Sequence, residues 1–223
     1  MIRPATLAAS AVLALVAAVA CSDIVAPSRT GLAYDWRLLV DYDSAGLTFQ
    51  DTLSFHWPRN SLPVKVWVED QDGLPGHIGT AIRTWKAAFV YGEWDAKIVS
   101  DSATADVIVR AIQPPPQTSS LHFALAEACI GATDVDTVAN RHQLKVPVHA
   151  YVYVSIPGDP TLDECLNTVA THELGHTMGL FQHSKDSTDI MFAVPKADAL
   201  TQSDIATIIN AYHFTPTMTP VRP

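Results

Sequence analysis

Two histidines and a glutamate share one short stretch of the sequence, His172-Glu173-Leu174-Gly175-His176. Apolar residues at helical spacing surround it, and Pro160 and Thr161 precede it, so a helix is predicted to begin there, with Glu164 completing a capping box. Residues four apart lie on one face of a helix, which lets both imidazoles reach one metal ion. The carboxylate of Glu173 projects from the adjacent position, where it can reach a water on that metal.

A third histidine follows at a distance that suits a chain reversal. Gly179 comes three residues after His176 and can adopt the left-handed conformation that ends a helix. His183 lies just beyond that turn, where it can return as a third ligand. Three neutral imidazoles that leave one coordination position open are typical of catalytic Zn²⁺. A surface helix with a fortuitous pair of histidines is the alternative, and the added glycine and third histidine disfavour it.

The spacing of apolar residues along the chain predicts the strands and helices that would position these residues. Alternating valines predict a strand over Val64–Val68. After a turn cluster at residues 70–76, apolar residues at helical spacing predict an amphipathic helix over residues 77–90. Further strands are predicted over residues 95–99, 106–111 and 146–156.

The first twenty residues indicate export. Arg3 precedes an apolar run that is short for a membrane span but suits the hydrophobic region of a signal peptide. The tetrapeptide Ala18-Val19-Ala20-Cys21 resembles a bacterial lipobox, whose cysteine is lipidated and becomes the mature N-terminus, although Ala18 stands where leucine is usual. Plain cleavage after Ala20, without lipid, is the alternative. We therefore expect an exported protein, either secreted or anchored in a bacterial membrane through Cys21, with the outer membrane preferred.

The rest of the chain is expected to form one domain with appendages. Residues 1–20 are assigned to the signal peptide, 21–50 to a tether and an N-terminal segment with one strand indicated near Trp36, 51–214 to the domain, and 215–223 to a tail. Removal of the signal peptide leaves 13 basic against 23 acidic residues, which argues against nucleic acid as a partner. We expect a monomer.

Export also changes how the cysteines are interpreted. If Cys21 carries a lipid, Cys129 and Cys165 remain as a pair in a compartment that permits disulfides. Two buried free thiols are the alternative. We expect the bridge between Cys129 and Cys165, which would join two segments that are 36 residues apart.

The complete string from His172 to His183 resembles the extended zinc signature of the metzincin metalloproteases. Met191 follows eight residues after His183, where metzincins place a methionine turn beneath the metal. An ordinary core methionine is the alternative for this residue.

Further residues are similar to the matrixin branch of the metzincins. Ser184 after the third histidine is typical of matrixins. With Phe192 after the methionine, the turn lacks the tyrosine that astacins and serralysins carry near the metal. The last predicted helix, at residues 200–212, and the upstream strands and helix also resemble those of matrixins. The resemblance covers about residues 53–214.

The resemblance implies an α+β fold, the two-lobed zincin fold of the metzincins. A twisted mixed sheet of four to five strands would pack with two long helices in the upper lobe. A small C-terminal lobe would hold His183, the methionine turn and a final helix. The active cleft would run between the two lobes.

The implied activity is that of a zinc endopeptidase acting on extracytoplasmic proteins or peptides. One catalytic Zn²⁺, held by His172, His176 and His183, would activate a water, and Glu173 would act as the general base. A non-catalytic zinc-containing binding lipoprotein is the alternative from another class. A zincin with a glutamate as third ligand is a second alternative, which the position of His183 makes unnecessary.

Some matrixin features have no clear counterpart in the sequence. No cysteine-switch motif of the Pro-Arg-Cys-Gly type precedes the domain, so latency through cysteine–zinc coordination is unsupported. His122, His142 and His149 lie in the stretch where matrixins bind a structural zinc, but at a different spacing, and we expect ordinary surface or core histidines. Bound Ca²⁺ is likewise unsupported, because turns explain the candidate carboxylates, which are Asp70, Asp72, Asp134 and Asp136.

The resemblance also indicates where a peptide would bind. The segment Cys129-Ile130-Gly131-Ala132-Thr133 occupies the place of the edge strand that borders the cleft. An extended peptide would add there through main-chain hydrogen bonds to Ile130, Gly131 and Ala132. After the methionine turn, Val194 and Pro195 would line an apolar pocket just past the scissile bond. A bridge to Cys165 would then tie the substrate-binding strand to the metal-bearing helix.

Overall fold

The computed structural model describes residues 31–44, 47–113, 121–123, 128–137 and 142–222. Among these residues lies a mixed sheet of six strands in the order β4-β3-β5-β9-β7-β6. Its strands are β3 (Val64–Val68), β4 (Ala96–Val99), β5 (Val107–Arg110), β6 (Leu121–Phe123), β7 (Cys129–Asp134) and β9 (Val148–Val154). The helices are α2 (Leu74–Lys86), α3 (Leu162–Thr177) and α4 (Gln202–His213), with short 3₁₀ turns at η1 (Arg59–Ser61) and η2 (Ser102–Thr104).

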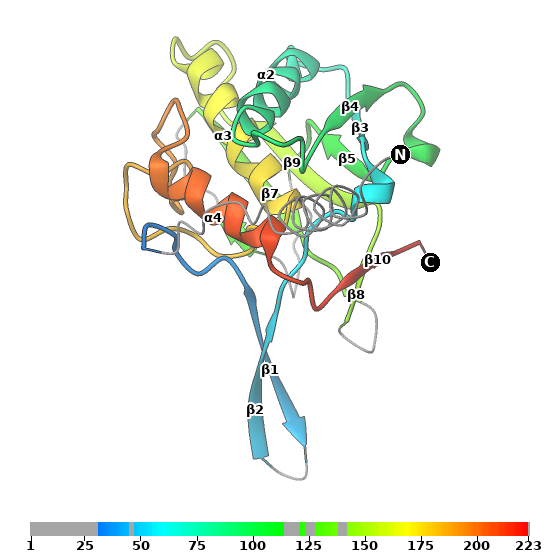
Figure 1. The fold of residues 1–223 in the computed structure, drawn as a ribbon. Helices are drawn as coiled ribbons and strands as arrows, with labels where there is room; N and C mark the ends of the chain where they lie inside the picture. The colour runs from blue at the N-terminus through cyan, green and yellow to red at the C-terminus, as the bar shows by residue number, and fades with distance from the viewer. Residues whose placement is uncertain (1–30, 45–46, 114–120, 124–127, 138–141, 223) are drawn as a thin grey trace, which may run out of the picture.

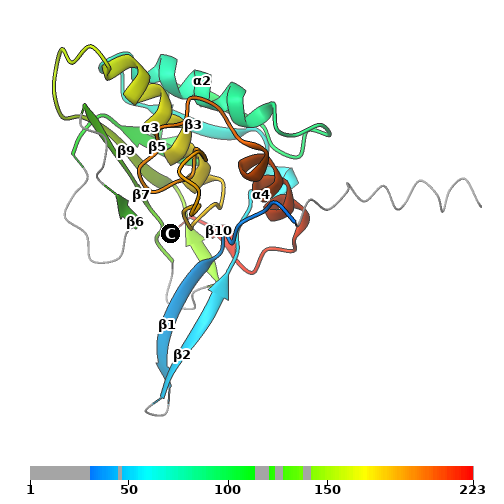
Figure 2. The same cartoon turned by 90° about the vertical axis from the view of Figure 1, so that its left-hand side faces the viewer.

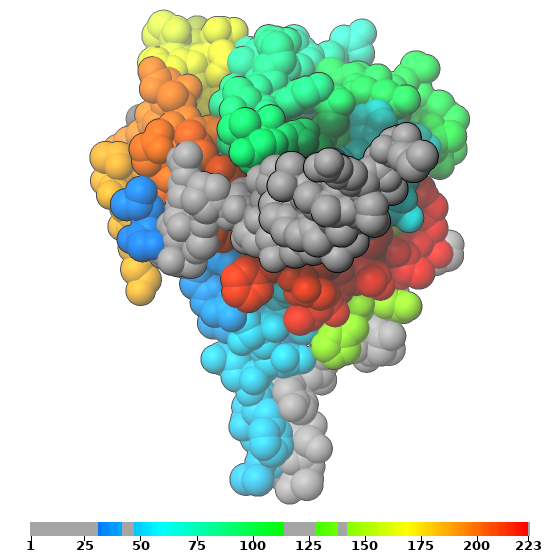
Figure 3. Space-filling model, viewed as in Figure 1, coloured from blue at the N-terminus to red at the C-terminus, as the bar shows by residue number. Residues whose placement is uncertain are grey.

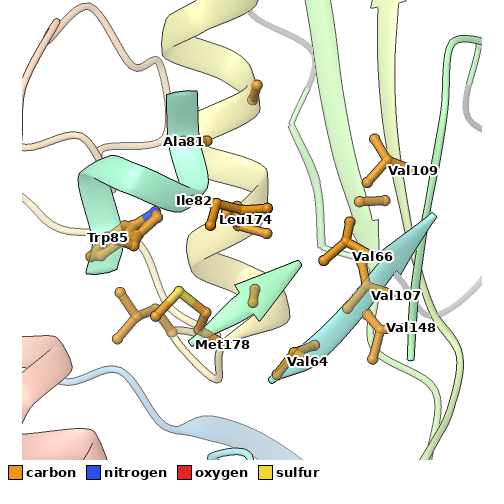
Figure 4. Close-up of a cluster of buried hydrophobic side chains, with 14 of the residues drawn as sticks. Val64, Val66, Ala81, Ile82, Trp85, Val107, Val109, Val148, Leu174 and Met178 are labelled. Carbon is orange, nitrogen blue, oxygen red and sulfur yellow. The ribbon is translucent and has the colours of Figure 1, made fainter. Parts of the chain in front are cut away.

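Helices α2 and α3 lie side by side on one face of this sheet, as Figures 1 and 2 show. The strands β3, β4, β5 and β9 run parallel, whereas β7 is antiparallel to β9. Every second residue of a strand points to the same side, so Val64, Val66 and Val107 are all buried beneath the helices. Figure 4 shows this cluster beside Trp85 of α2 and Leu174 of α3. This packing fixes the position of the helix that carries the histidines.

The predicted α+β fold is confirmed, and the structure corrects two of its details. The sheet has one strand more than the four to five expected, because the three-residue β6 pairs with β7 on the side away from β9. Helix α2 begins at Leu74 instead of near His77, since Pro75 in its first turn has a backbone angle suited to a helix start and lacks only an amide that would be unpaired there. The other predicted strands and helices agree with observed elements to within a few residues.

Beyond Gly179 the chain forms a smaller part of the molecule that ends in α4 (Figure 1). Residues 180–201 carry His183 and Met191 past the end of α3, and α4 follows them. A short parallel pair, β8 (Gln143–Lys145) and β10 (Thr219–Val221), ties the C-terminal residues to the segment before β9. Strand β10 therefore lies in the stretch predicted as a tail.

The N-terminal part of the described chain forms a hairpin of β1 (Leu38–Ser44) and β2 (Leu47–Leu53). The hairpin stands clear of the body in Figures 1 and 3, whereas its base is held by the buried side chains of Trp36, Leu53 and Phe55. It crosses the boundary predicted between residues 50 and 51. Only one of its two strands is indicated by the sequence.

None of the helices in the described ranges is long and apolar enough to cross a membrane. The predicted signal peptide, the lipobox with Cys21 and most of the predicted tether lie outside the described residues.

Candidate metal centre

Helix α3 brings His172, Glu173 and His176 into the interior, where all three side chains are buried. The predicted capping box at its start is wrong. The Thr161 hydroxyl donates to Oδ1 of Asp159 at 2.6 Å and accepts no hydrogen bond from the helix, because the Thr161 backbone (φ −94°, ψ 3°) is far from the extended conformation that capping requires. Packing of the apolar face, not a cap, therefore stabilises α3.

The turn after α3 is a Schellman motif at Gly179. The amide of Gly179 donates to the carbonyl of His176 at 3.1 Å, and the next amide donates to the carbonyl of Gly175 at 3.2 Å. Gly179 has a φ of 109°, and a Cβ at this position would overlap the carbonyl oxygen of Phe55. Only glycine suits both conditions, so the chain reverses here and returns His183 toward α3.

The three histidines meet through their Nε2 atoms. Nε2 of His176 lies 3.0 Å from that of His172 and 3.2 Å from that of His183. Nδ1 of His172 faces the carbonyl oxygen of Ile190 at 2.7 Å, and Nδ1 of His176 faces that of Leu180. A carbonyl only accepts, so each of these Nδ1 atoms carries the proton and, in a neutral ring, each Nε2 presents a lone pair. Two lone pairs at this separation repel each other unless both bind a cation.

Burial keeps these imidazoles neutral. It lowers the pKa of His172 to about 3 and that of His183 to about 4, and it lowers the pKa of His176 well below its usual value. Neutral imidazole is the form that binds Zn²⁺, and tetrahedral zinc with Zn–N bonds of about 2.0–2.1 Å places two nitrogens roughly 3.3 Å apart. The observed separations fit this geometry. Within the described ranges, these histidines are the one group of His, Cys, Asp or Glu that could hold a metal.

Glu173 follows the first ligand but is not part of the ligand cluster. Its Oε2 accepts a hydrogen bond from the hydroxyl of Thr133, in β7, at 2.7 Å. Burial raises the pKa of Glu173 to about 8, and the bond from Thr133 acts in the opposite direction. The site therefore holds a carboxylate that is buried, bonded at one oxygen, and adjacent in sequence to His172.

Met191 lies against the metal-binding helix, where the resemblance places the methionine turn. The side chain is fully buried, and a Cβ added to Gly175 of α3 would lie only 2.5 Å from its Sδ. The carbonyl of Met191 accepts the amide of Ser184, next to the third histidine, at 2.8 Å. The residue before it, Ile190, supplies the carbonyl that orients His172. The turn thus contacts both parts of the chain that carry the ligands.

Two buried carboxylates hold this turn, and the sequence analysis identified neither. Asp204 accepts the amides of Ile190 at 2.9 Å and Thr201 at 3.0 Å, and Asp189 accepts the hydroxyls of Ser184 and Thr201. Thr201 and Asp204 form a reciprocal capping box at the start of α4. The T-x-x-D spacing that identifies this box is visible in the sequence and could have indicated Asp204.

A segment near the N-terminus also supports the site. The carbonyl of Trp36 accepts the amides of Phe181 at 2.7 Å and Gln182 at 3.3 Å, directly before the third ligand. The hydroxyl of Tyr34 donates to Oδ1 of Asp204 at 3.1 Å. No local pattern predicts such contacts, because Tyr34 and Asp204 are 170 residues apart in the chain.

The structure contains the predicted disulfide between Cys129 and Cys165, which joins the first residue of β7 to the start of α3. It also corrects one prediction for this strand. β7 is not an edge strand, because Gly131 and Ala132 are paired with β6 on its outer side, while Ile130 lies just beyond these pairs. Main-chain groups expected to receive a peptide are thus engaged by the protein's own chain.

The two residues predicted to line a pocket past the scissile bond lie in one segment after the methionine turn. Val194 and Pro195 are half-buried in a segment that runs beside α3, where the hydroxyl of Thr168 donates to the carbonyl of Ala197 at 3.2 Å. Their role in a substrate pocket stays a prediction.

Two of the other residues considered for structural metals, His142 and Asp136, have protein partners. Nδ1 of His142 lies 3.2 Å from the carbonyl oxygen of Thr217, and Asp136 forms an ion pair with Lys145 at 3.8 Å. Burial lowers the pKa of His149. The side chain of His122 lies outside the described part of the structure. Nothing in the described ranges therefore supports a second metal site, and calcium is not tested.

A two-lobed α+β fold, three convergent histidines and a methionine turn beneath them define the metzincin class of zinc metalloproteases. Within that class, a family model described as Matrixin matches residues 83–213, more than half of the chain. The chain therefore belongs to the matrixin family.

Comparison with solved structures identifies High choriolytic enzyme 1, a hatching enzyme zinc-protease from Oryzias latipes (Medaka fish). The sequence identity is 13% and the TM-score is 0.37, over 71% of this chain and 94% of that chain. No curated protein matches the sequence.

Proposed function

We propose that the protein is an exported zinc endopeptidase that cleaves extracytoplasmic proteins, with Glu173 as its general base. The observation that carries the proposal is the pair of unprotonated Nε2 atoms of His172 and His176, 3.0 Å apart, beside a buried carboxylate that is not a ligand. A site built only to hold a structural metal has no need of such a carboxylate. Membership of a family of zinc metalloproteases supports the same reading.

The chain's own residues have distinct roles in this proposal. His172, His176 and His183 would hold the metal, and the carbonyls that accept from the first two rings keep their Nε2 atoms directed at it. When bound, Zn²⁺ would activate a water, polarise the scissile carbonyl and favour the ionised form of Glu173. Glu173 would take the proton from the attacking water and deliver it to the leaving amine.

The proposal is tested by incubating the mature protein with unfolded casein, with and without a zinc chelator. Cleavage should require the metal and return when zinc is restored. The Glu173→Ala variant should keep one zinc per chain by elemental analysis and lose activity by several orders of magnitude. The matched control is Glu164→Ala, which removes a carboxylate near the start of the same helix and should leave both measurements unchanged.

A non-catalytic zinc-binding lipoprotein is the competing function. It predicts a folded, zinc-loaded protein with no chelator-sensitive cleavage of casein at any enzyme concentration. That result would refute the protease proposal and favour the binding protein.

Localisation is part of the proposal. The predicted signal peptide and the resemblance to a lipobox at Cys21 support export and membrane anchoring, and the Cys129–Cys165 disulfide suits an oxidising compartment. A peptide substrate that approaches along β7 must accommodate the pairing that β6 already makes with this strand.

A further inference from the structure

One face of β7 contacts one face of α3 at three successive levels. Residues 129, 131 and 133 alternate along the strand, and residues 165, 169 and 173 lie four apart along the helix, so each set shares one face. Two residues of strand advance about 6.6 Å, and four residues of helix advance about 6.0 Å. The two faces therefore stay nearly in step over this distance.

Each level makes a different kind of contact. At the first, Cys129 is joined to Cys165 by the disulfide. At the second, Gly131 leaves a notch, because a Cβ there would lie 2.6 Å from Cγ1 of Val169 and 2.8 Å from Cδ of Glu173. The carboxylate of Glu173 thus occupies space that any other residue at position 131 would take.

The third level holds Glu173 by a hydrogen bond. Thr133 is fully buried, and its hydroxyl donates to Oε2 of Glu173 at 2.7 Å, while the Glu173 carbonyl lies 3.3 Å from the same hydroxyl. The two carboxylate oxygens are therefore not equivalent. Oε2 is bonded to Thr133, whereas Oε1 lies over the notch at Gly131.

We propose that Gly131 and Thr133 form a cradle that sets the orientation of the Glu173 carboxylate, so that Thr133 is a positioning residue of the reaction. This inference rests on the proposed function, in which Glu173 is the base. A carboxylate on a flexible side chain must give up rotamer freedom to react, which costs conformational entropy. The hydrogen bond at Oε2 already fixes the side chain, so this cost is not part of the reaction barrier, and Oε1 is left to accept the proton. The disulfide joins the same strand and helix at the first level of this contact.

The test compares Thr133→Val, which keeps the shape and removes the hydroxyl, with Thr133→Ser, which keeps the hydroxyl. The valine variant should lower kcat for casein-derived peptides by about tenfold to a hundredfold, the range that corresponds to loss of a hydrogen bond to a charged group. KM and zinc content should not change, and serine should restore most of the rate. Thr104→Val, which removes a threonine hydroxyl of the 3₁₀ turn η2 that donates to the carbonyl of Asp101, is the control.

A double-variant comparison separates positioning from general support of the fold. In a Glu173→Ala background, Thr133→Val should have no further effect on the residual rate, because the group it positions is gone. A further loss of similar size there would overturn the proposal, as would a Thr133→Val enzyme with wild-type kcat. Failure of both Thr133→Val and Thr133→Ala to fold would assign Thr133 to structure and also overturn it.

The outcomes distinguish this inference from the proposed function. Wild-type protein that is folded and zinc-loaded but inactive refutes the protease itself. An active wild type that needs Glu173 but tolerates loss of the Thr133 hydroxyl refutes only the cradle.

Discussion

Loss of the Cys129–Cys165 bridge should destabilise the fold by an amount that follows from the length of the closed loop. The two cysteines are 36 residues apart, and in the chain-entropy model a loop of this length contributes about 4 kcal/mol to the free energy of unfolding. For a protein of this size, 1 kcal/mol shifts the midpoint of thermal unfolding by about 2–4 °C. Reduction should therefore lower the midpoint by roughly 8–16 °C.

Calorimetry of the zinc-loaded protein before and after mild reduction measures this shift, because reduction leaves every other side chain unchanged. All samples would carry Cys21→Ser, so that no lipid or third thiol contributes. The variant with both bridge cysteines replaced by alanine gives a second measurement, with a small packing loss added because Cys129 is fully buried. Peptide mapping without reductant confirms the starting bridge.

Zinc content should stay at one per chain after reduction, since the proposed ligands are His172, His176 and His183 and no cysteine is among them. A midpoint that falls by less than about 3 °C would refute the loop-length argument. Loss of zinc while the fold persists would show that the bridge supports the metal centre directly. In that case the view that the disulfide stabilises only the fold, and not the metal centre, would be wrong.

Three further predictions concern the surroundings of the site. Gly175→Ala should place a Cβ against Sδ of Met191, and it should lower the free energy of unfolding by about 1–3 kcal/mol and weaken zinc binding. Urea unfolding measures the first effect and competition with a chromogenic chelator the second. Unchanged values would contradict the close contact. Tyr34→Phe removes one donor to Asp204 and should cost about 1 kcal/mol in urea unfolding, with no cost if the bond is absent in solution. Cys21→Ser should move the protein from the membrane to the soluble exported fraction, and a wild type already soluble without detergent would exclude the lipid.

The metal ligands could be predicted from the sequence because their geometry is local. His172 and His176 are four residues apart, so they lie on one face of the helix. Gly179 allows the chain to reverse after the helix, which returns His183 toward that face. The convergence of these three residues is therefore predictable from local sequence, although distant contacts hold the loop that carries His183. The disulfide was predictable for a different reason, since the predicted export and lipidation of Cys21 leave two cysteines to pair.

The residues that orient the site could not be predicted in this way. Thr133 and Glu173 are 40 residues apart, and a threonine in a strand has no local feature that indicates its partner. The pairing of β6 with β7 was missed because β6 has only three residues, too few to show an alternating pattern. The hairpin was half missed for a related reason. Its apolar pairs, such as Leu38 opposite Leu53, become evident only when the register is known.

The part of the chain that positions the histidines extends well before the family match at residues 83–213. Strand β3 lies between β4 and β5, so a chain beginning at residue 83 would lose the strand that joins them and expose the sheet's interior edges. It would also lose the Trp36 carbonyl that accepts the two amides before His183, and the Phe55 backbone that lies against Gly179. Buried amides without hydrogen-bond partners destabilise the fold, and here they would destabilise the loop that carries His183. The zinc signature specifies the chemistry locally, whereas the distance between its histidines depends on contacts that begin at Tyr34.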